Sequence, residues 1–246
     1  EPDATGGVPA DGAPCRYCSD RSGLANFWRS LAGNPLVYVA SAINGLPGLK
    51  GDGATANLTN IGLNTAWGDW TIFTVFQRAA SGAAAGHRLL DKKYDTGFLL
   101  ARDGANAQWG GGIMEGTSPY GIYCTASNDA APQILCSMRS NNATTSNHDI
   151  WLSGETNHIA NTTPTGPIDT AILALGAAFA GGSPNSSTFA TIAATIIYGR
   201  ALTFAERATV WSYLGTKYAI TLSGMGGGAS HFSPETLGLN SLRGIH

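Results

Sequence analysis

Short runs of strand-forming residues, separated by turn-forming clusters, recur along most of the chain and constrain its fold most strongly. The clearest run is WTIFTVF at 70–76, and further runs lie at 36–39, 46–50, 98–102 and 189–198. β-branched and aromatic residues without a polar break predict a strand buried on both faces. Many short strands with Gly, Asn and Asp between them predict a β-sandwich.

Composition agrees with a turn-rich β protein and excludes two other classes. Gly accounts for 33 of 246 residues, and only 12% of residues are charged. Lys and Arg number 14 against 16 Asp and Glu, a net charge of −2, so no basic face is available for nucleic acid. The 43% hydrophobic content is enough for a packed core and excludes an acidic disordered chain.

One helix is expected near the C-terminal end of the sandwich. Thr203 and Glu206 have the spacing of a capping box, in which each side chain accepts a hydrogen bond from the other residue's backbone. Apolar residues then recur on one helical stripe at Val210, Trp211, Leu214 and Tyr218. We expect a helix over about 203–218 that packs on the edge or the convex face of the sandwich.

The chain divides into one domain and two arms. Residues 1–14 are rich in Gly, Pro and Ala and predict an extended N-terminal arm. Residues 15–222 form the sandwich domain, and 223–246 form a flexible Gly-rich linker with a C-terminal arm. The longest apolar stretch, 171–182, is too short for a membrane span, which needs about 20 apolar residues.

Four cysteines allow three interpretations. Cys124 and Cys136 lie in two apolar runs on either side of a turn-rich segment, which predicts a hairpin and a disulfide between them. A disulfide would indicate an extracellular setting. Four buried free thiols are one alternative. A zinc site is the weaker one, because Cys15 and Cys18 supply only half of a paired knuckle pattern.

Three motifs in order carry a family resemblance. They are VPADGAP at 8–14 followed by Arg16-Tyr17 and DRSG at 20–23, INGLPGLKGDG at 43–53, and IIYGRALTFAER at 196–207 with its continuation at 213–220. This order resembles the concanavalin A-like, laminin-G-like jelly-roll domains of bacterial and phage surface proteins, over about residues 8–220. The resemblance implies an all-β, concanavalin A-like jelly-roll sandwich. It also places Cys15 and Cys18 in one early strand with their side chains on opposite faces, which argues against a shared metal.

Catalytic patterns are missing from the sequence. A glycosidase needs two facing carboxylates, whereas Asp91, Asp149 and Glu155 are scattered among the predicted strands. His87 and Arg88 with Tyr120 or Tyr123 could be arranged as in the lyases of this fold, but isolated strand residues are the simpler interpretation. The sequence contains no Gly-x-Ser-x-Gly elbow and no phosphate-binding loop, and the triple glycine at 110–112 indicates a bend or bulge. We therefore expect a protein that is not an enzyme.

Ligand binding would use exposed aromatic residues and loop carboxylates. Trp67 and Trp109 have Gly and polar neighbours and are the candidates for stacking on a sugar, whereas Trp70 and Trp151 are expected in the core. Asp91, Asp95 and Asp103 lie in or beside predicted loops as candidate ligand contacts. We expect a ligand site that needs no cofactor. The alternative is a Ca²⁺ site, for which the same three residues are the candidates.

The sequence therefore predicts a non-catalytic recognition or adhesion module at a cell or virion surface, which binds a glycan or a surface receptor. The first alternative is a virion structural protein, such as a capsid decoration or tail component. Its terminal arms would contact neighbouring subunits, with identical copies assembling side by side. A carbohydrate-active enzyme is the second alternative. Neither nucleic acid nor a membrane span is expected.

Overall fold

The computed structural model describes residues 8–19, 27–30, 34–53, 55–60, 68–78, 88–92, 98–102, 108–115, 118–124, 131–141, 146–163, 173–180, 183–187 and 190–224. These residues form β-strands and one helix, α1 (Phe204–Tyr218). The strands are β1 (Pro14–Cys15), β2 (Tyr17–Ser19), β3 (Phe27–Arg29), β4 (Leu36–Ile43), β5 (Leu46–Lys50), β6 (Leu58–Asn60), β7 (Trp70–Arg78), β8 (Arg88–Lys92), β9 (Phe98–Arg102), β10 (Trp109–Glu115), β11 (Ser118–Tyr123), β12 (Gln133–Asn141), β13 (Ser146–Leu152), β14 (His158–Thr163), β15 (Leu173–Leu175), β16 (Ala177–Ala180), β17 (Ser183–Ser187) and β18 (Ala190–Tyr198).

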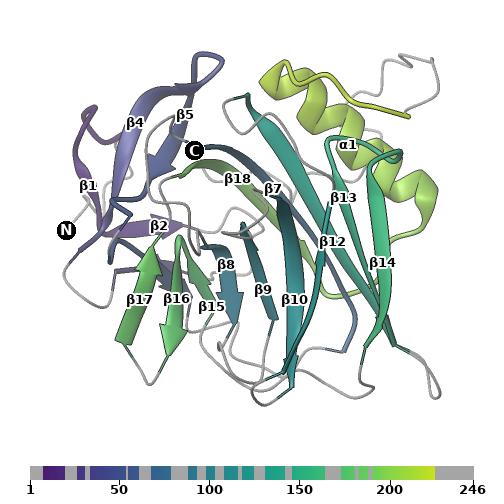
Figure 1. Ribbon diagram of the computed structural model, residues 1–246. Coiled ribbons are helices and arrows are strands. Elements are labelled where there is room, and N and C mark those ends of the chain that lie inside the picture. The colour runs from purple at the N-terminus through teal and green to yellow at the C-terminus, as the bar shows by residue number, and fades with distance from the viewer. Residues whose placement is uncertain are drawn as a thin grey trace.

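Most strands belong to two antiparallel sheets (Figure 1). Sheet A has the order β1-β4-β5-β18-β7-β12-β13-β14, and sheet B has the order β11-β10-β9-β8-β15-β6-β3-β2. A separate hairpin consists of β16 and β17. Strands that are neighbours in a sheet are often distant in sequence, as with β18 and β7, so the connections cross between the sheets. The predicted all-β sandwich with one helix is confirmed.

The main core lies between the two sheets. Trp70 of sheet A stacks on Phe98 of sheet B with ring centroids 4.9 Å apart. The ring centroids of Phe76 in sheet A and Trp109 in sheet B are 4.4 Å apart. Trp70 is fully buried, as the sequence predicted for this strand. Burial of large aromatic side chains from both sheets is what holds the two layers together.

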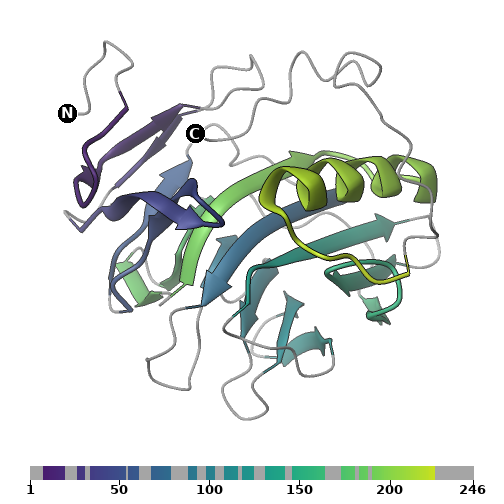
Figure 2. The same cartoon turned by 90° about the horizontal axis from the view of Figure 1, so that it is seen from above.

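A second core lies on the opposite face of sheet A, where α1 packs (Figure 2). The helix buries Trp211 against Phe73, with an edge-to-face contact of 5.2 Å between ring centroids. Val210, Leu214 and Tyr218 are buried in the same cluster, so the predicted apolar stripe is confirmed. Because β7 has apolar residues on both faces, sheet A is covered by sheet B on one side and by α1 on the other.

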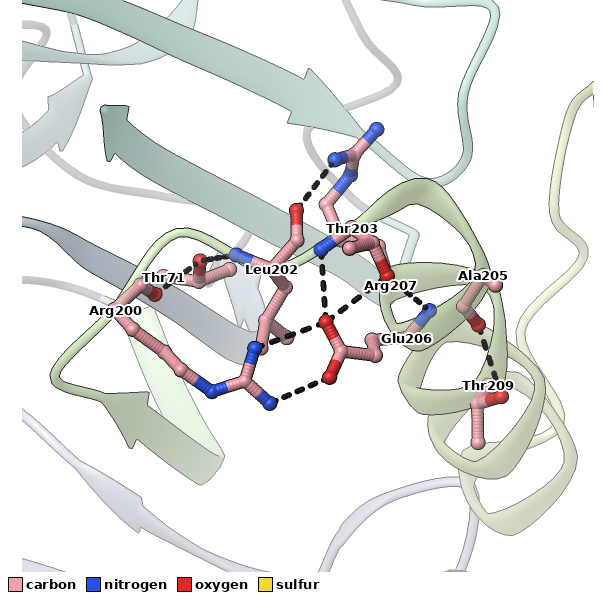
Figure 3. Close-up of polar contacts among 8 residues, drawn as sticks. All are labelled: Thr71, Arg200, Leu202, Thr203, Ala205, Glu206, Arg207 and Thr209. Atoms are coloured by element: carbon pink, nitrogen blue, oxygen red, sulfur yellow. Dashed lines mark hydrogen bonds and ion pairs between the residues drawn. The ribbon is translucent and has the colours of Figure 1, made fainter. Parts of the chain in front are cut away.

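The junction between β18 and α1 is a closely bonded turn (Figure 3). Thr203 accepts from the Glu206 backbone N–H, and the Glu206 carboxylate accepts from the Thr203 backbone N–H, which confirms the predicted capping box. The same carboxylate forms a two-pronged ion pair with Arg200, at 2.6 and 2.9 Å. Thr71 Oγ1 donates to Arg200 O and accepts from Leu202 N, which ties the turn to β7. This most specific of the family-like motifs therefore has a structural role.

The two earlier motifs also make structural contacts. Asn44 and Gly45 both have positive φ, 48° and 82°, as a tight β4–β5 hairpin requires. Asn44 Nδ2 donates to Tyr218 O, 2.6 Å away, which fixes this hairpin to the end of α1. Asp52 Oδ1 accepts from the backbone N–H groups of residues 55 and 56, and Asp11 Oδ1 accepts from Ala40 N at 2.8 Å.

Three further observations concern the N-terminal arm, the glycines of β10 and membrane spans. The Gly12 backbone N–H donates to Tyr38 O, so part of the predicted N-terminal arm is bonded to β4. The arm and linker boundaries as a whole remain a prediction.

The bend or bulge predicted at 110–112 is wrong, because these glycines lie in β10 in unbroken register with β9 and β11. None of the described helical segments is long and apolar enough to cross a membrane.

Candidate functional site

The structure does not gather the predicted ligand contacts into one site. Trp109 is fully buried against Phe76, so its expected exposure is wrong, and it cannot stack on a sugar that approaches from solvent. Asp91 is also fully buried and cannot contact such a ligand. Trp67, Asp95 and Asp103 lie outside the described residues and remain predictions. Trp151 is 4% exposed, as expected for a core residue.

The predicted disulfide is not formed. Cys124 and Cys136 are both free and buried. Cys124 lies in the core between the sheets, whereas Cys136 lies in the core under α1, so sheet A separates them. The hairpin interpretation was wrong because β11 belongs to sheet B and β12 belongs to sheet A.

The other two cysteines also differ from the expectation. Cys15 and Cys18 do not share a strand, because Cys15 ends β1 in sheet A and Cys18 lies in β2 in sheet B. Their side chains are hydrogen-bonded to each other instead of pointing to opposite faces. Among the described residues, no group of three or more His, Cys, Asp or Glu side chains could hold a metal ion. The Ca²⁺ alternative would thus rest on residues beyond this part of the chain.

A serine–histidine pair lies between the two sheets. Ser137 Oγ is 2.9 Å from His148 Nε2, and both residues are fully buried. Trp70 Nε1 donates to Ser137 Oγ at 3.3 Å, so the serine hydroxyl is available to donate to Nε2. Arg139 lies beside them, with its guanidinium 5.4 Å from the centre of the Trp70 ring.

This pair does not have the properties of a nucleophile and its general base. Desolvation by burial, with a smaller contribution from the Arg139 charge, lowers the pKa of His148 to about 3. Such an imidazole is a weak base at neutral pH. His148 Nδ1 has no hydrogen-bond partner in the described part of the chain, so no carboxylate orients the ring as in a catalytic triad. The pair is best explained as a buried polar contact in the core.

A partly exposed polar patch lies on the outer face of β13 and β14, beside α1. We call Asn147, Asp149, His158 and the supporting Trp151 the β13–β14 patch. The His158 imidazole lies flat on the Trp151 ring, with centroids 4.6 Å apart and an interplanar angle of 14°. Asp149 Oδ1 holds the ring through Nε2 at 2.9 Å. His158 is 37% exposed, so this ring reaches solvent although Trp151 is stacked against it.

The patch rests on a buried ion pair that fixes its base. The Arg207 guanidinium lies over Trp151, 4.4 Å from the ring centre, and bonds Glu155 through two contacts of 3.2 Å. Glu155 also accepts from Trp211 Nε1 at 3.0 Å. Two elements, α1 and the β13–β14 turn, thus hold Trp151 in one position. The patch is a preorganised flat ring with a carboxylate beside it.

The sequence does not predict this patch. In the sequence Asp149 and Glu155 are scattered carboxylates, whereas the structure pairs the first with His158 and the second with Arg207. The contacts depend on the register in which Trp151 lies opposite His158 in the β13–β14 ladder. Alternation of side chains along 146–152 was the one signal that could have placed Asp149 and Trp151 on a common face.

Similar structures support the fold. No protein-family model matches the sequence, and a search of curated proteins finds no significant match. The CBM40 of the Ruminococcus gnavus IT-sialidase, bound to α2,3-sialyllactose, has a TM-score of 0.52 and 14% identity, over 66% of this chain and 95% of that chain. A Trypanosoma rangeli sialidase mutant with trans-sialidase activity has a TM-score of 0.53 and 16% identity, over 80% of this chain and 31% of that chain. A third similar structure comes from botulinum neurotoxin type C, whose cell entry depends on interaction with two ganglioside molecules. It has a TM-score of 0.52 and 12% identity, over 82% of this chain and 51% of that chain. At these identities the likeness shows the jelly-roll fold, as the sequence predicted.

Proposed function

We propose that this chain is a non-catalytic recognition module that binds a glycan, or a receptor through its glycan, on a bacterial or phage surface. The observation that carries the proposal is the fold. The match to the sugar-bound CBM40 covers 95% of that chain, so nearly the whole of that domain has a counterpart here. The wider context, display on a bacterium or a phage, is supported by the three sequence motifs that resemble such proteins.

We propose the β13–β14 patch as the contact surface within the described part of the chain. The solvent-accessible part of the His158 ring can contact the apolar face of a sugar, and the Asp149 carboxylate can accept hydrogen bonds from its hydroxyls. Both side chains are already oriented, by Trp151 and by each other. A rigid ring and a fixed acceptor reduce the entropy that binding would otherwise cost.

The charge of the patch favours one kind of glycan. Asp149 is a carboxylate at its centre, and Glu155, which lies in the connection between β13 and β14, is already paired with Arg207. A sugar with its own carboxylate would place two negative charges close together, which costs energy. We therefore expect neutral, hydroxyl-rich glycans to bind better than sialylated ones.

A glycan array that contains matched neutral and sialylated oligosaccharides tests both parts of the proposal. The intact chain should give reproducible neutral hits. Asp149→Ala and His158→Ala should each weaken those hits about tenfold or more, a loss near 1.4 kcal/mol. Lys50→Ala is the matched control, because it removes an exposed charge from β5, outside the patch, and should leave binding unchanged.

Three outcomes would count against the proposal. Hits that survive both patch substitutions would place the binding surface elsewhere on the chain. An array without reproducible hits would refute glycan binding and favour the virion structural alternative, which copurification with particles at a fixed copy number would support. Turnover of any polysaccharide would refute the non-catalytic assignment.

A further inference from the structure

Two thiols lie in contact where the chain crosses from one sheet to the other. Cys15 ends β1 at the edge of sheet A, and Cys18 lies in β2 at the edge of sheet B. The two side chains are hydrogen-bonded to each other, and neither cysteine forms a disulfide. Sulfur atoms at hydrogen-bonding distance are close to the arrangement that a disulfide needs.

The backbone holds this crossing in place. Cys15 lies opposite Leu36 in sheet A, and Cys18 lies opposite Trp28 in sheet B. Ser30 N donates to Arg16 O at 3.0 Å between them, and Cys15 Sγ donates to Tyr17 O at 3.2 Å. The sulfur atoms are thus brought together by the paired strands on both sides, and a bond between them requires no new strand pairing.

We propose that Cys15 and Cys18 are a redox-active pair that closes to an intrachain disulfide by exchange with a low-molecular-weight disulfide such as oxidised glutathione. The bond would fasten the edge of sheet A to the edge of sheet B across a single turn. This proposal is independent of glycan binding, because the pair lies in β1 and β2 whereas the β13–β14 patch lies at the opposite edge of sheet A.

The two cysteines have different parts in the exchange. Cys18 is partly exposed, so its thiolate attacks one sulfur of oxidised glutathione, forms a mixed disulfide and releases one glutathione thiolate. Buried Cys15 then attacks Cys18 Sγ as a thiolate, and the second glutathione leaves. The chain loses two protons and two electrons, and one glutathione disulfide is reduced to two glutathione thiols.

The environment of Cys15 differs between the reduced pair and the mixed disulfide. In the reduced pair, the hydrogen bond with Cys18 lowers the pKa of the Cys15 thiol, burial opposes this change, and the backbone contact with Tyr17 adds to the lowering. In the mixed disulfide Cys18 has no S–H to donate, so the second step depends on the position of Cys15 beside Cys18 and not on a lowered pKa.

The other two cysteines provide an internal control. Burial raises the pKa of Cys124 to about 12 and also raises that of Cys136. Sheet A separates the two, so they cannot reach each other. We expect both to remain thiols under conditions that oxidise Cys15 and Cys18.

Peptide mapping of the folded chain after incubation with oxidised glutathione tests the proposal. Free thiols are alkylated after unfolding, and the chain is digested with trypsin without reduction. Trypsin cleaves after Arg16, between the two cysteines, so the disulfide appears as peptide 1–16 linked to peptide 17–21. The linked peptides should come from chains that run as monomers on a non-reducing gel, and the link should disappear on reduction. Cys124 and Cys136 should be fully alkylated in the same sample.

Two serine variants test the order of the steps. Cys15→Ser should stop at the mixed disulfide, so peptide 17–21 carries glutathione. Cys18→Ser should give neither the linked pair nor an adduct at Cys15, because that thiol is only 4% exposed. The proposal is overturned if Cys15 and Cys18 are still alkylated after oxidation, if the link forms between two chains, or if Cys124 and Cys136 oxidise equally fast.

Discussion

Ser137 Oγ lies 2.9 Å from His148 Nε2 in the buried layer between the two sheets. This contact joins β12 to β13 across the face that β10 covers, and it keeps a titratable ring where charge is unfavourable. His148 has no second partner at Nδ1 in the described part of the chain, and the Arg139 charge is nearby. The consequence of this contact concerns stability at low pH and not catalysis.

Acid should destabilise the fold through His148. Burial lowers the pKa of His148 from 6.5 to about 3 in the folded chain, so below pH 6.5 the unfolded chain binds the proton first. The free energy of unfolding should therefore fall with decreasing pH by up to about 1.4 kcal/mol per unit, until the folded form also protonates near pH 3. Urea unfolding between pH 7 and pH 4 measures this slope.

Two variants separate titration from hydrogen bonding. His148→Gln should flatten the slope between pH 6.5 and 4, because no imidazole remains to protonate. Ser137→Ala should keep the slope and lower the stability at pH 7 by about 1 kcal/mol through the lost hydrogen bond. A slope that is the same in His148→Gln and the intact chain would show that another group causes the acid effect.

The Glu155–Arg207 pair should be important for stability. Both side chains are largely buried, at 12% and 10% exposure, and Glu155 also accepts from Trp211 Nε1. Glu155→Ala would leave a buried guanidinium and an indole N–H without this partner, for which we expect a loss of about 3 kcal/mol. Thermal or urea unfolding at pH 7 measures the change.

A double variant identifies the cause of that loss. Glu155→Ala with Arg207→Met removes both charges, so it should be more stable than Glu155→Ala alone. If the two variants were equally unstable, lost packing around Trp151 would explain the effect better than the uncompensated charge.

Local features were predictable from the sequence, and features that depend on strand pairing were not. The capping box of Thr203 and Glu206 was found because both residues lie within one helical turn. Trp109 was placed wrongly because its sequence neighbours are Gly and polar residues, whereas its burial comes from Phe76 in the facing sheet. Face and depth in a sandwich depend on partners that lie far away in the chain.

The same limit applies to the cysteines and to the patch. Cys124 and Cys136 looked like partners because they flank one turn, but their strands join different sheets. The family resemblance predicts that Cys15 and Cys18 point to opposite faces of one strand, but the chain changes sheets between them. His158 meets Asp149 only in the β13–β14 register, which periodicity within either strand does not specify.

The cap of α1 should contribute measurably to stability. Thr203→Ala removes the hydroxyl that accepts from the Glu206 backbone N–H, and we expect a loss of about 1 kcal/mol. Thr203→Ser keeps the hydroxyl and should restore most of that loss. Circular dichroism at 222 nm during thermal unfolding compares the variants. Equal midpoints for all three chains would contradict the assigned role.

Acid should also weaken this cap. The hydrogen bonds from Arg200, and then those from Thr203, lower the pKa of Glu206 to about 2. The carboxylate therefore contributes stability above its ordinary pKa of 4.5, and that contribution is lost as the pH falls toward 2. Glu206→Gln should lack this dependence, which unfolding curves between pH 5 and pH 3 would detect in a His148→Gln background.

Gly110 should tolerate no side chain, for a reason that its sequence context does not reveal. It lies in regular β10, and a Cβ there would meet Ile122 O and would lie 2.6 Å from Tyr123 Cα, both in the backbone of β11. Backbone of a paired strand cannot move aside as a flexible side chain can, so Gly110→Ala should cost about 3 kcal/mol or more. Gly199→Ala is the matched control, because a Cβ at that exposed position has no neighbour within 4 Å. If Gly110→Ala unfolded at the same urea concentration as Gly199→Ala, β10 and β11 could not be packed as closely as this register requires.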